Sequence, residues 1–284
     1  MRRSLLLFSV SLLTVATIPL PPTPEPVFEL HRTENADFID PLNRNPLFIL
    51  VLGSDVREGD PFRGRADSIH IVAVNTKTGK GTIIGIPRDA LVGGRKINAY
   101  LLGGGQAMTD VVKRLTGLPI HYWAAIEFSR FRRLIDKLGG LEVNVPYPMV
   151  DRFSGANFKK GVKKMNGEQV LAFSRNRKTV PGGDFGRSEN HGRVLLAALD
   201  KFRGDARDPF TTLKYFREFR GLVKANVPIE HLIRLAEVAR RLEPKNFRNV
   251  VVPAASGSSG GASVQILGGG ARQIFDAVRD DGVL

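Results

Sequence analysis

Cysteine is absent from this chain of 284 residues. The absence excludes disulfide frameworks, thiol nucleophiles and thiolate metal sites, so a bound metal must be held by oxygen or imidazole ligands. The five histidines show no close metal-ligand spacing. One of them, His70, falls in the middle of an expected strand and is interpreted as a structural residue. Carboxylate oxygens are therefore the strongest candidate metal ligands.

Nucleotide-binding and serine-hydrolase signatures are also missing. No segment has the form G-x-x-x-x-G-K-[ST], and the glycine clusters at 103–105 and 268–270 do not form G-x-G-x-x-G. Ser54 in "GSDVR" lacks the second glycine of a G-x-S-x-G nucleophile elbow, which makes it a weak candidate nucleophile. The sequence thus gives no support to nucleotide binding or to nucleophilic serine chemistry.

Acidic residues are scarce relative to basic ones, with 28 Asp and Glu against 42 Lys and Arg and a net charge of +14. Such a balance favours polyanionic partners, whether nucleic acid, anionic lipid or a phosphorylated polymer. Charge alone does not choose among them. Because no known nucleic-acid-binding motif is present, we do not expect nucleic acid to be the partner.

The N-terminus carries a targeting segment. Arg2 and Arg3 precede an uncharged apolar run over residues 4–20, which is short for a bilayer span and slightly long for the core of a signal peptide. No clear small-x-small cleavage site follows, so we expect an uncleaved single-pass anchor in the cell membrane, with the rest of the chain extracytoplasmic. A cleaved signal peptide and a secreted protein are the alternative. The proline-rich residues 21–45 are expected to form a stiff linker.

From residue 46 the pattern predicts a single α/β domain over residues 46–284. The run 47–52 is apolar throughout, as in a strand buried on both faces, and the segments 69–75 and 81–86 flank a polar turn of hairpin length. Further strands are expected at 141–146 and 249–252, helices at about 128–138, 189–203, 209–224, 228–242 and 270–282, and a flexible loop at 255–263. We therefore predict a central mixed β-sheet sandwiched between helices.

Charged residues cluster where the early strands end, which is where open α/β sheets bind ligands. The first strand leads into Asp55. Arg65 and Asp67 come just before the core of the second strand. The third strand leads into the residues Arg88, Asp89, Arg95, Lys96 and Asn98. Carboxylates and cations recurring together suit a metal-bridged phosphate. Spacing alone leaves open the alternative that they form surface ion pairs on a basic protein.

A second charged segment, "AFSRNRKTVPGGDFGR", spans residues 172–187. In an extended segment Arg175 and Arg177 would share a face, and the Pro-Gly-Gly turn would let Arg187 fold back from the start of the next helix. Helix N-termini attract anions, so the segment could close on a phosphate. Its pattern fits a phosphate clamp and a basic surface loop equally well.

Six segments in this order resemble the LytR-CpsA-Psr family of bacterial cell-envelope enzymes. The resemblance is strong over residues 46–204 and looser beyond. The segments are "FILVLGSDVR", "RADSIHIVAVNTKTGKGTIIGIPRDALV", "KINAYLLGGGQ", "FSRFRRLIDKLGGLEVNVPYPMVD", "MNGEQVLAFSRNRKTVPGGDFGR" and the helix that follows.

The resemblance implies an extracytoplasmic phosphotransferase that moves a glycopolymer from a polyprenyl pyrophosphate carrier onto peptidoglycan through a phosphodiester, usually with Mg²⁺. It assigns metal binding and acid–base roles to Asp55 and Asp67. On chemical grounds Asp89 is a spare base, because a carboxylate near the acceptor could deprotonate a sugar hydroxyl. The resemblance implies that an apolar pocket among the helices houses the lipid tail. Pyrophosphate binding falls to Arg88, Arg175, Arg177 and Arg187, with Arg65 and Lys96 as secondary candidates.

Two positions depart from the family pattern. Ala66 stands where a serine is common, and Asn190 stands where the helix after "GDFGR" usually brings another arginine. One phosphate contact is then lost or is supplied by Arg193. Two further hypotheses keep the same site: a polyprenyl pyrophosphate hydrolase that uses water as acceptor, and a non-catalytic envelope protein that binds lipid-linked polymer.

Overall fold

The computed structural model describes residues 41–284, so the predicted anchor at 1–20 and most of the predicted linker at 21–45 lie outside the described residues. Along residues 41–284, no helix combines the length and the apolar character that a bilayer span requires. Ahead of the first strand lies a short 3₁₀ helix, η1 (Pro41–Asn43).

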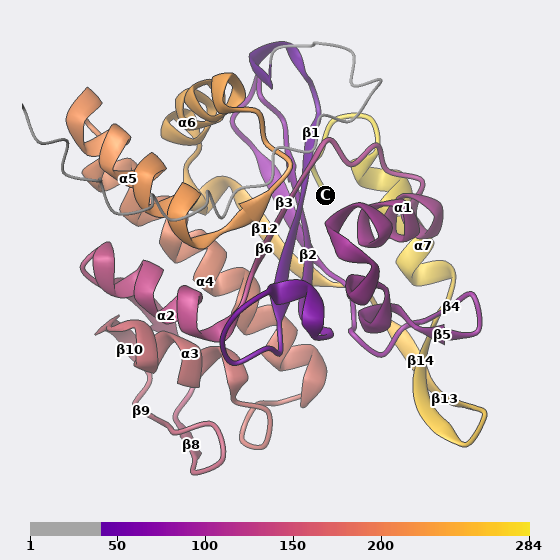
Figure 1. The fold of residues 1–284 in the computed structure, drawn as a ribbon. Helices are drawn as coiled ribbons and strands as arrows, with labels where there is room; N and C mark the ends of the chain where they lie inside the picture. Colours follow the sequence, from indigo (N-terminus) through magenta and orange to yellow (C-terminus); the bar gives the residue numbers. More distant parts are fainter. Residues whose placement is uncertain (1–40) are drawn as a thin grey trace, which may run out of the picture.

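A mixed six-stranded sheet forms the centre of the fold (Figure 1), as predicted. The central strand β1 runs antiparallel to β2 and parallel to β6, while β3 runs antiparallel to β2 and parallel to β12. In order across the sheet the strands are β11 (Lys224–Ala225), β6 (Tyr122–Ile126), β1 (Leu47–Ser54), β2 (Ala66–Val74), β3 (Gly81–Gly85) and β12 (Phe247–Val251).

Helices cover both faces of this sheet (Figure 1). Because side chains alternate along a strand, the apolar run of β1 feeds two cores: Phe48, Leu50 and Leu52 pack on one face, and Leu47 and Ile49 on the other. The first face is covered by α1 (Gly104–Thr116), α7 (Gly269–Val278) and the 3₁₀ helix η3 (Ile97–Gly103), and the second by α4 (Asp184–Asp205), α5 (Pro209–Leu222) and α6 (Ile229–Arg241).

A smaller unit packs against α4 around a core of its own, which includes Val143, Met149 and Phe173. The predicted strand at 141–146 lies here, as β7 paired with β10, rather than in the central sheet. The unit consists of α2 (Phe128–Lys137), β7 (Leu141–Val145), β8 (Met149–Asp151), β9 (Ala156–Phe158), β10 (Gly161–Met165) and α3 (Gly167–Arg175).

The expectation of a flexible loop at 255–263 is wrong. These residues form a hairpin of β13 (Ala254–Ser259) and β14 (Ala262–Leu267). Gly260 and Gly261 make its turn with φ values of 57° and 80°, the left-handed conformation that two-residue hairpin turns require. The serine- and glycine-rich residues 255–263 therefore form a tight turn and parts of the two strands that flank it. The remaining short elements are η2 (Pro61–Arg63), β4 (Leu91–Val92), β5 (Arg95–Lys96) and η4 (Pro244–Asn246).

Candidate active site

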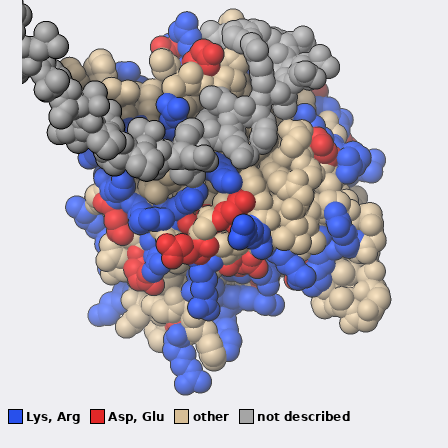
Figure 2. All heavy atoms as spheres, in the orientation of Figure 1, with Lys and Arg blue, Asp and Glu red and all other residues tan. Residues whose placement is uncertain are grey.

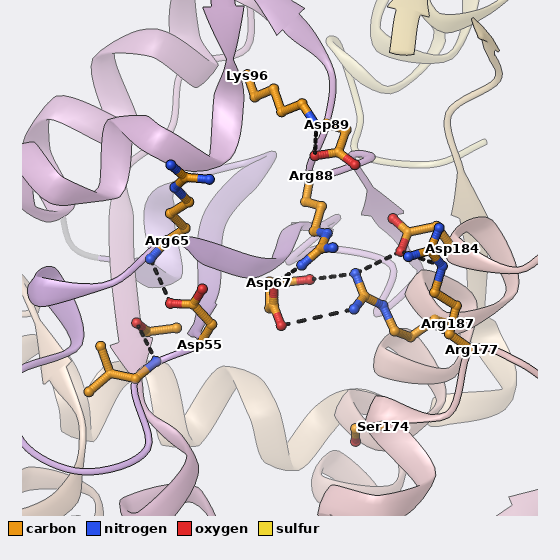
Figure 3. A network of polar contacts seen from close by, with 12 residues as sticks. Asp55, Arg65, Asp67, Arg88, Asp89, Lys96, Ser174, Arg177, Asp184 and Arg187 are labelled. Carbon is orange, nitrogen blue, oxygen red and sulfur yellow. Dashed lines mark hydrogen bonds and ion pairs between the residues drawn. The ribbon is translucent and has the colours of Figure 1, made fainter. Parts of the chain in front are cut away.

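Three predicted site residues converge at the edge of the sheet: Asp67 near the start of β2, Arg88 after β3 and Arg187 in the first turn of α4 (Figure 3). Arg88 Nη1 donates to Asp67 Oδ1. Arg187 Nη1 lies 3.9 Å from Asp67 Oδ2, and Arg187 Nη2 donates to the Asp67 carbonyl over 3.5 Å. One carboxylate thus holds two guanidinium groups side by side.

The Arg187 side chain is only 9% exposed, so its buried charge needs acidic partners. Its second acidic partner is Asp184, at 2.9 Å, which also lies 3.8 Å from the guanidinium Nε of Arg177. Burial and the nearby charges of Arg88 and Arg177 lower the pKa of Arg187, against the opposing effect of the two aspartates. At Arg88, burial also lowers the pKa, but Asp67 outweighs it and the net shift is upward.

Asp55 and Arg65 lie to one side of this network (Figure 3). The Arg65 backbone N–H donates to Asp55 Oδ1 over 2.7 Å, and the Asp55 N–H donates to the Arg65 carbonyl over 3.0 Å. These bonds tie the end of β1 to the start of β2 and leave the Arg65 side chain exposed. Within residues 41–284, Asp55 forms no ion pair with Arg88 or Arg187, the two arginines that contact Asp67.

Asp89 and Lys96 form a separate ion pair of 3.1 Å next to Arg88, with both side chains about 30% exposed. Figure 3 shows this pair on the far side of Arg88 from Asp67. Lys96 belongs to β5, and the pair holds the loop after β3. Both residues therefore lie beside the network without entering it.

The expected geometry of Arg175 and Arg177 is wrong, because Arg175 is the last residue of α3 and not part of an extended segment. Asn176 then leaves the helix, so the two arginines do not share a strand face. Arg175 is exposed, with its guanidinium carbon 5.3 Å from the centre of the Phe128 ring. The other half of the prediction is confirmed: the Pro-Gly-Gly turn leads into α4 and brings Arg187 back to the site.

Next to the network lies a cavity of about 130 Å³ between the sheet and helices α2, α3 and α4. Its polar lining comprises Asp67, Ser68, Glu127, Ser174, Arg175, Arg187 and His191. The buried Glu127 caps α2 beside it by accepting a hydrogen bond from the Arg130 N–H at 2.9 Å. The apolar lining comprises Val51, Leu52, Ile126, Phe128, Phe131, Leu171, Val194 and Leu195. An apolar pocket among the helices is what the family resemblance led us to expect, and here arginines belong to its polar lining.

Two histidines, the buried His70 and the partly buried His191, lie behind the arginines, and sequence reasoning missed their arrangement. His70 Nε2 donates to the Ser188 carbonyl at 2.9 Å, and His191 Nε2 donates to the Ser174 carbonyl at 2.7 Å. Burial lowers the pKa of His70 to about 4 and that of His191 well below its ordinary value. Both rings are therefore neutral at pH 7 and connect β2, α3 and α4. Sequence singled out His70 as structural, which agrees with its complete burial.

Sequence reasoning also left Asp184 without a role, although it stands in the quoted "GDFGR" motif. At the first position of α4 its carboxylate occupies the anion-favouring helix end and contacts two arginines.

The two departures from the family pattern lie in packed positions. Ala66 and Asn190 are buried, and the Asn190 side-chain amide nitrogen has no hydrogen-bond partner. Arg193 forms an ion pair with Glu189 one helical turn earlier. In this structure Arg193 is therefore already engaged and does not replace the arginine that the family pattern has at position 190.

Comparisons with known proteins show bacterial relatives of this chain. A Bacillus licheniformis protein named polyisoprenyl-teichoic acid–peptidoglycan teichoic acid transferase TagU is 34% identical over 170 residues, or 57% of this chain and 54% of that protein. Bacillus subtilis TagV, named for the same reaction, is 30% identical over 232 residues, or 71% of this chain and 58% of that protein. The chain thus spans little more than half the length of these relatives.

Solved structures share the fold. The crystal structure of B. subtilis TagV matches with a TM-score of 0.72 and 24% identity, covering 84% of this chain and 97% of that chain. The LytR-Csp2A-Psr enzyme from Actinomyces oris matches with a TM-score of 0.65 and 21% identity, covering 86% and 92%. The model of the LytR_cpsA_psr family matches residues 27–277. Since that match covers most of the sequence, the chain belongs to the LytR_cpsA_psr family.

Proposed function

We propose that this chain is an extracytoplasmic transferase that moves a glycopolymer from a polyprenyl pyrophosphate carrier onto peptidoglycan. The observation that carries the proposal is the Asp67–Arg88–Arg187 network at the polar side of an apolar cavity. An apolar chamber suits a prenyl chain, and fixed guanidinium groups suit the pyrophosphate next to it. The names of the TagU and TagV relatives, which act on polyisoprenyl-teichoic acid and peptidoglycan, support the same reaction.

In the proposed reaction, a peptidoglycan hydroxyl oxygen attacks the phosphorus that carries the glycopolymer. A new P–O bond forms, the bond to the polyprenyl phosphate breaks, and the hydroxyl proton passes to a carboxylate. Negative charge grows on the departing phosphate, so guanidinium groups aimed there lower the barrier more than they stabilise the bound substrate. Arg88 and Arg187 have this role in the proposal, and the exposed Arg175 and Arg177 add outer contacts.

The proposed base is Asp89, because Asp55 is proposed as a metal ligand. Asp67 is not the proposed base, because its carboxylate is already engaged by Arg88 and Arg187. Asp89 has one partner, Lys96, and stands next to Arg88 in the chain. Lys96 and Arg65 are proposed to contribute charge at the rim.

The donor chemistry at the mouth fits Mg²⁺. Asp55 and Asp67 would hold the ion, since Mg²⁺ typically binds one or two carboxylates together with substrate phosphates. No cluster of three or more metal-binding side chains exists within residues 41–284, so phosphate oxygens and water would complete the coordination. When bound, the ion would offset the charge of the pyrophosphate.

The apolar residues 4–20 support an extracytoplasmic location for the domain, as a single-pass membrane protein or, after cleavage, a secreted one. The lipid carrier and peptidoglycan are then both within its compartment. This placement agrees with the proposed substrates.

The direct test uses the full chain in detergent with Mg²⁺, a polyprenyl pyrophosphate glycan and peptidoglycan fragments. We expect release of polyprenyl phosphate with glycan joined to the fragments, and about a 10²–10³-fold loss of turnover in Arg88→Ala. Arg272→Ala, on α7, is the matched control and should retain wild-type turnover. Release without joining would identify a hydrolase, and lipid binding without release would identify a binding protein; either result overturns the proposal.

A further inference from the structure

Helix α5 has an exposed stripe that combines apolar and cationic side chains. Phe210 is 85% exposed and Leu213 is 65% exposed. Single apolar side chains at a surface are ordinary, but neighbouring ones mark an interaction surface. Three exposed cations follow on the same helix. We call these five residues the α5 stripe: Phe210, Leu213, Lys214, Arg217 and Arg220.

Helical spacing places the α5 stripe on a single surface. Each of its members lies three or four residues from another member, so the five side chains share one face of the helix. The opposite face packs inward, where Phe216 and Phe219 join the core on this side of the sheet and Leu222 is buried. The inward face is therefore satisfied by the fold, and the stripe is left without a partner among residues 41–284.

The α5 stripe carries positive charge with no exposed acid on the same helix. Glu218, the one acidic residue of α5, is buried, and its carboxylate pairs with Lys137 at 2.6 Å and with Arg217 at 3.2 Å. Lys214 and Arg220 form no ion pair within residues 41–284. Figure 2 shows basic side chains over much of the face in view, so charge alone does not single out α5. The exposed apolar side chains beside its cations do.

The described chain begins next to α5. The 3₁₀ helix η1 packs on α6, and Leu232 and Leu235 of α6 join the same core as α5. Figure 1 shows α5 and α6 on the same side of the sheet. Ile229 and Ile233 of α6 are also about half exposed. Since the predicted linker joins η1 to the apolar residues 4–20, the proposed anchor connects to the domain on the side formed by α5 and α6.

We infer that the α5 stripe binds the surface of a membrane that contains anionic lipids, as a second contact beyond the proposed anchor. An interfacial helix places apolar side chains at the depth of the lipid headgroups and cations against lipid phosphates. The α5 stripe offers both on one face. The inference rests on the proposed function for the presence of a bilayer beside the domain.

Docking through the α5 stripe would give the apolar cavity an orientation. Helix α5 packs on α2 and is tied to it by the ion pair of Glu218 with Lys137. Phe128 and Phe131, also on α2, line the cavity. A domain that lies on the membrane through α5 would therefore hold the cavity near the bilayer, from which a prenyl chain would come.

The test uses the full chain in vesicles of phosphatidylcholine and phosphatidylglycerol. Because the chain has no cysteine, Leu213→Cys provides a single site for a nitroxide spin label. Leu102→Cys is the matched control, since Leu102 is 56% exposed and belongs to η3 on the other face of the sheet. Electron paramagnetic resonance measures collisions of each label with oxygen, which concentrates in lipid, and with nickel ethylenediaminediacetate, a neutral complex that stays in water. We expect oxygen collisions to dominate at position 213 and nickel collisions at position 102.

The contribution of charge is measured in the spin-labelled Leu213→Cys chain. Lys214→Gln together with Arg220→Gln should lower the ratio of membrane-bound to free α5 about tenfold. Lys113→Gln together with Arg114→Gln removes the same charge from exposed positions of α1 and should keep the original ratio. Vesicles of phosphatidylcholine alone should weaken binding as the α5 variant does.

A label at position 213 that meets mainly nickel, in a chain that floats with the vesicles, would overturn the inference alone. A chain that does not float with them would contradict the proposed anchor as well. Loss of nickel collisions without a gain in oxygen collisions, at high protein density only, would show that a second copy of the chain covers the stripe. Equal effects of the two charge variants would reject anionic lipid as the ligand. The transfer assay with Arg88→Ala decides the proposed reaction separately.

Discussion

Arg187 is the residue on which the candidate site depends most. It is the most buried arginine of the network, and it contacts carboxylates from two different elements, Asp67 on β2 and Asp184 on α4. Its guanidinium is always charged and costly to bury, and these two acids offset that cost. Removing it therefore affects two things at once, the phosphate contact and the balance of charge between β2 and α4.

Arg187→Ala should reduce turnover in the transfer assay by about 10²–10³-fold and lower the free energy of unfolding by about 2 kcal/mol. Arg187→Lys keeps the charge but not the planar fork, so it should retain most of the stability and little of the turnover. Steady-state kinetics and urea unfolding measure the two effects. Wild-type turnover in Arg187→Ala would remove Arg187 from the site.

At the scale of elements, α4 positions the site by lying close against the sheet. Two glycines allow this approach. A Cβ atom on Gly192 would lie 1.9 Å from Asn249 Oδ1 of β12, and one on Gly85 of β3 would lie 2.5 Å from the Ser188 hydroxyl oxygen. Asn249 also donates from Nδ2 to the Glu189 carbonyl at 2.8 Å. The helix is thus bonded to the strand at the point where no side chain separates them.

Gly192→Ala should push α4 away from β12, break the Asn249 hydrogen bond and lower the free energy of unfolding by about 1–3 kcal/mol. The shift would displace Arg187 on the same helix, so turnover should fall as well. Gly204→Ala is the matched control on α4: a Cβ atom there meets nothing within 4 Å, and alanine favours helix by up to about 1 kcal/mol. Equal stability of the two variants would contradict this account of the packing.

Local pattern was sufficient for the elements that carry continuous apolar runs. The runs of β1 and β3 and the amphipathic α6 appear where the sequence predicts them. Local pattern was insufficient where the pairing partner of a strand depends on residues far along the chain. The strand β7 is an example, because its partner is β10. The serine- and glycine-rich β13 gave no hydrophobic signal, and the short apolar end of β14 was not recognised as a strand.

The candidate site shows the same limit. Residue types and strand ends indicated Asp67, Arg88 and Arg187, and the structure brings them together. Asp67 and Arg187 are 120 residues apart, so only the fold determines that they meet. Asp55 and Asp89 had the same local signal and lie beside the network, because backbone bonds to Arg65 and the pair with Lys96 hold them there.

At the scale of the whole molecule, stability should depend on pH through the buried neutral histidines. The free energy of unfolding changes with pH wherever the folded and unfolded chains bind different numbers of protons. Burial lowers the pKa of His70 from an ordinary 6.5 to about 4, so between these values the unfolded chain takes up a proton that the folded chain does not. Protonation of the neighbouring His191 would also place a positive charge near the arginines of the site. The pKa of His191 is lowered by burial and also by the charges of Arg187 and Arg88.

The contribution of His70 is therefore fully present above pH 6.5 and is lost as the pH falls toward 4. The loss is on the order of 3 kcal/mol for this one group. His70→Gln, which keeps a donor for the Ser188 carbonyl, should flatten the fall in unfolding free energy across that window, while His121 and His191 maintain the remainder. Urea unfolding at a series of pH values gives both curves. Parallel curves for the variant and the wild type would show that His70 is protonated equally in both states, and that the packing of α4 on β2 does not resist acid through this ring.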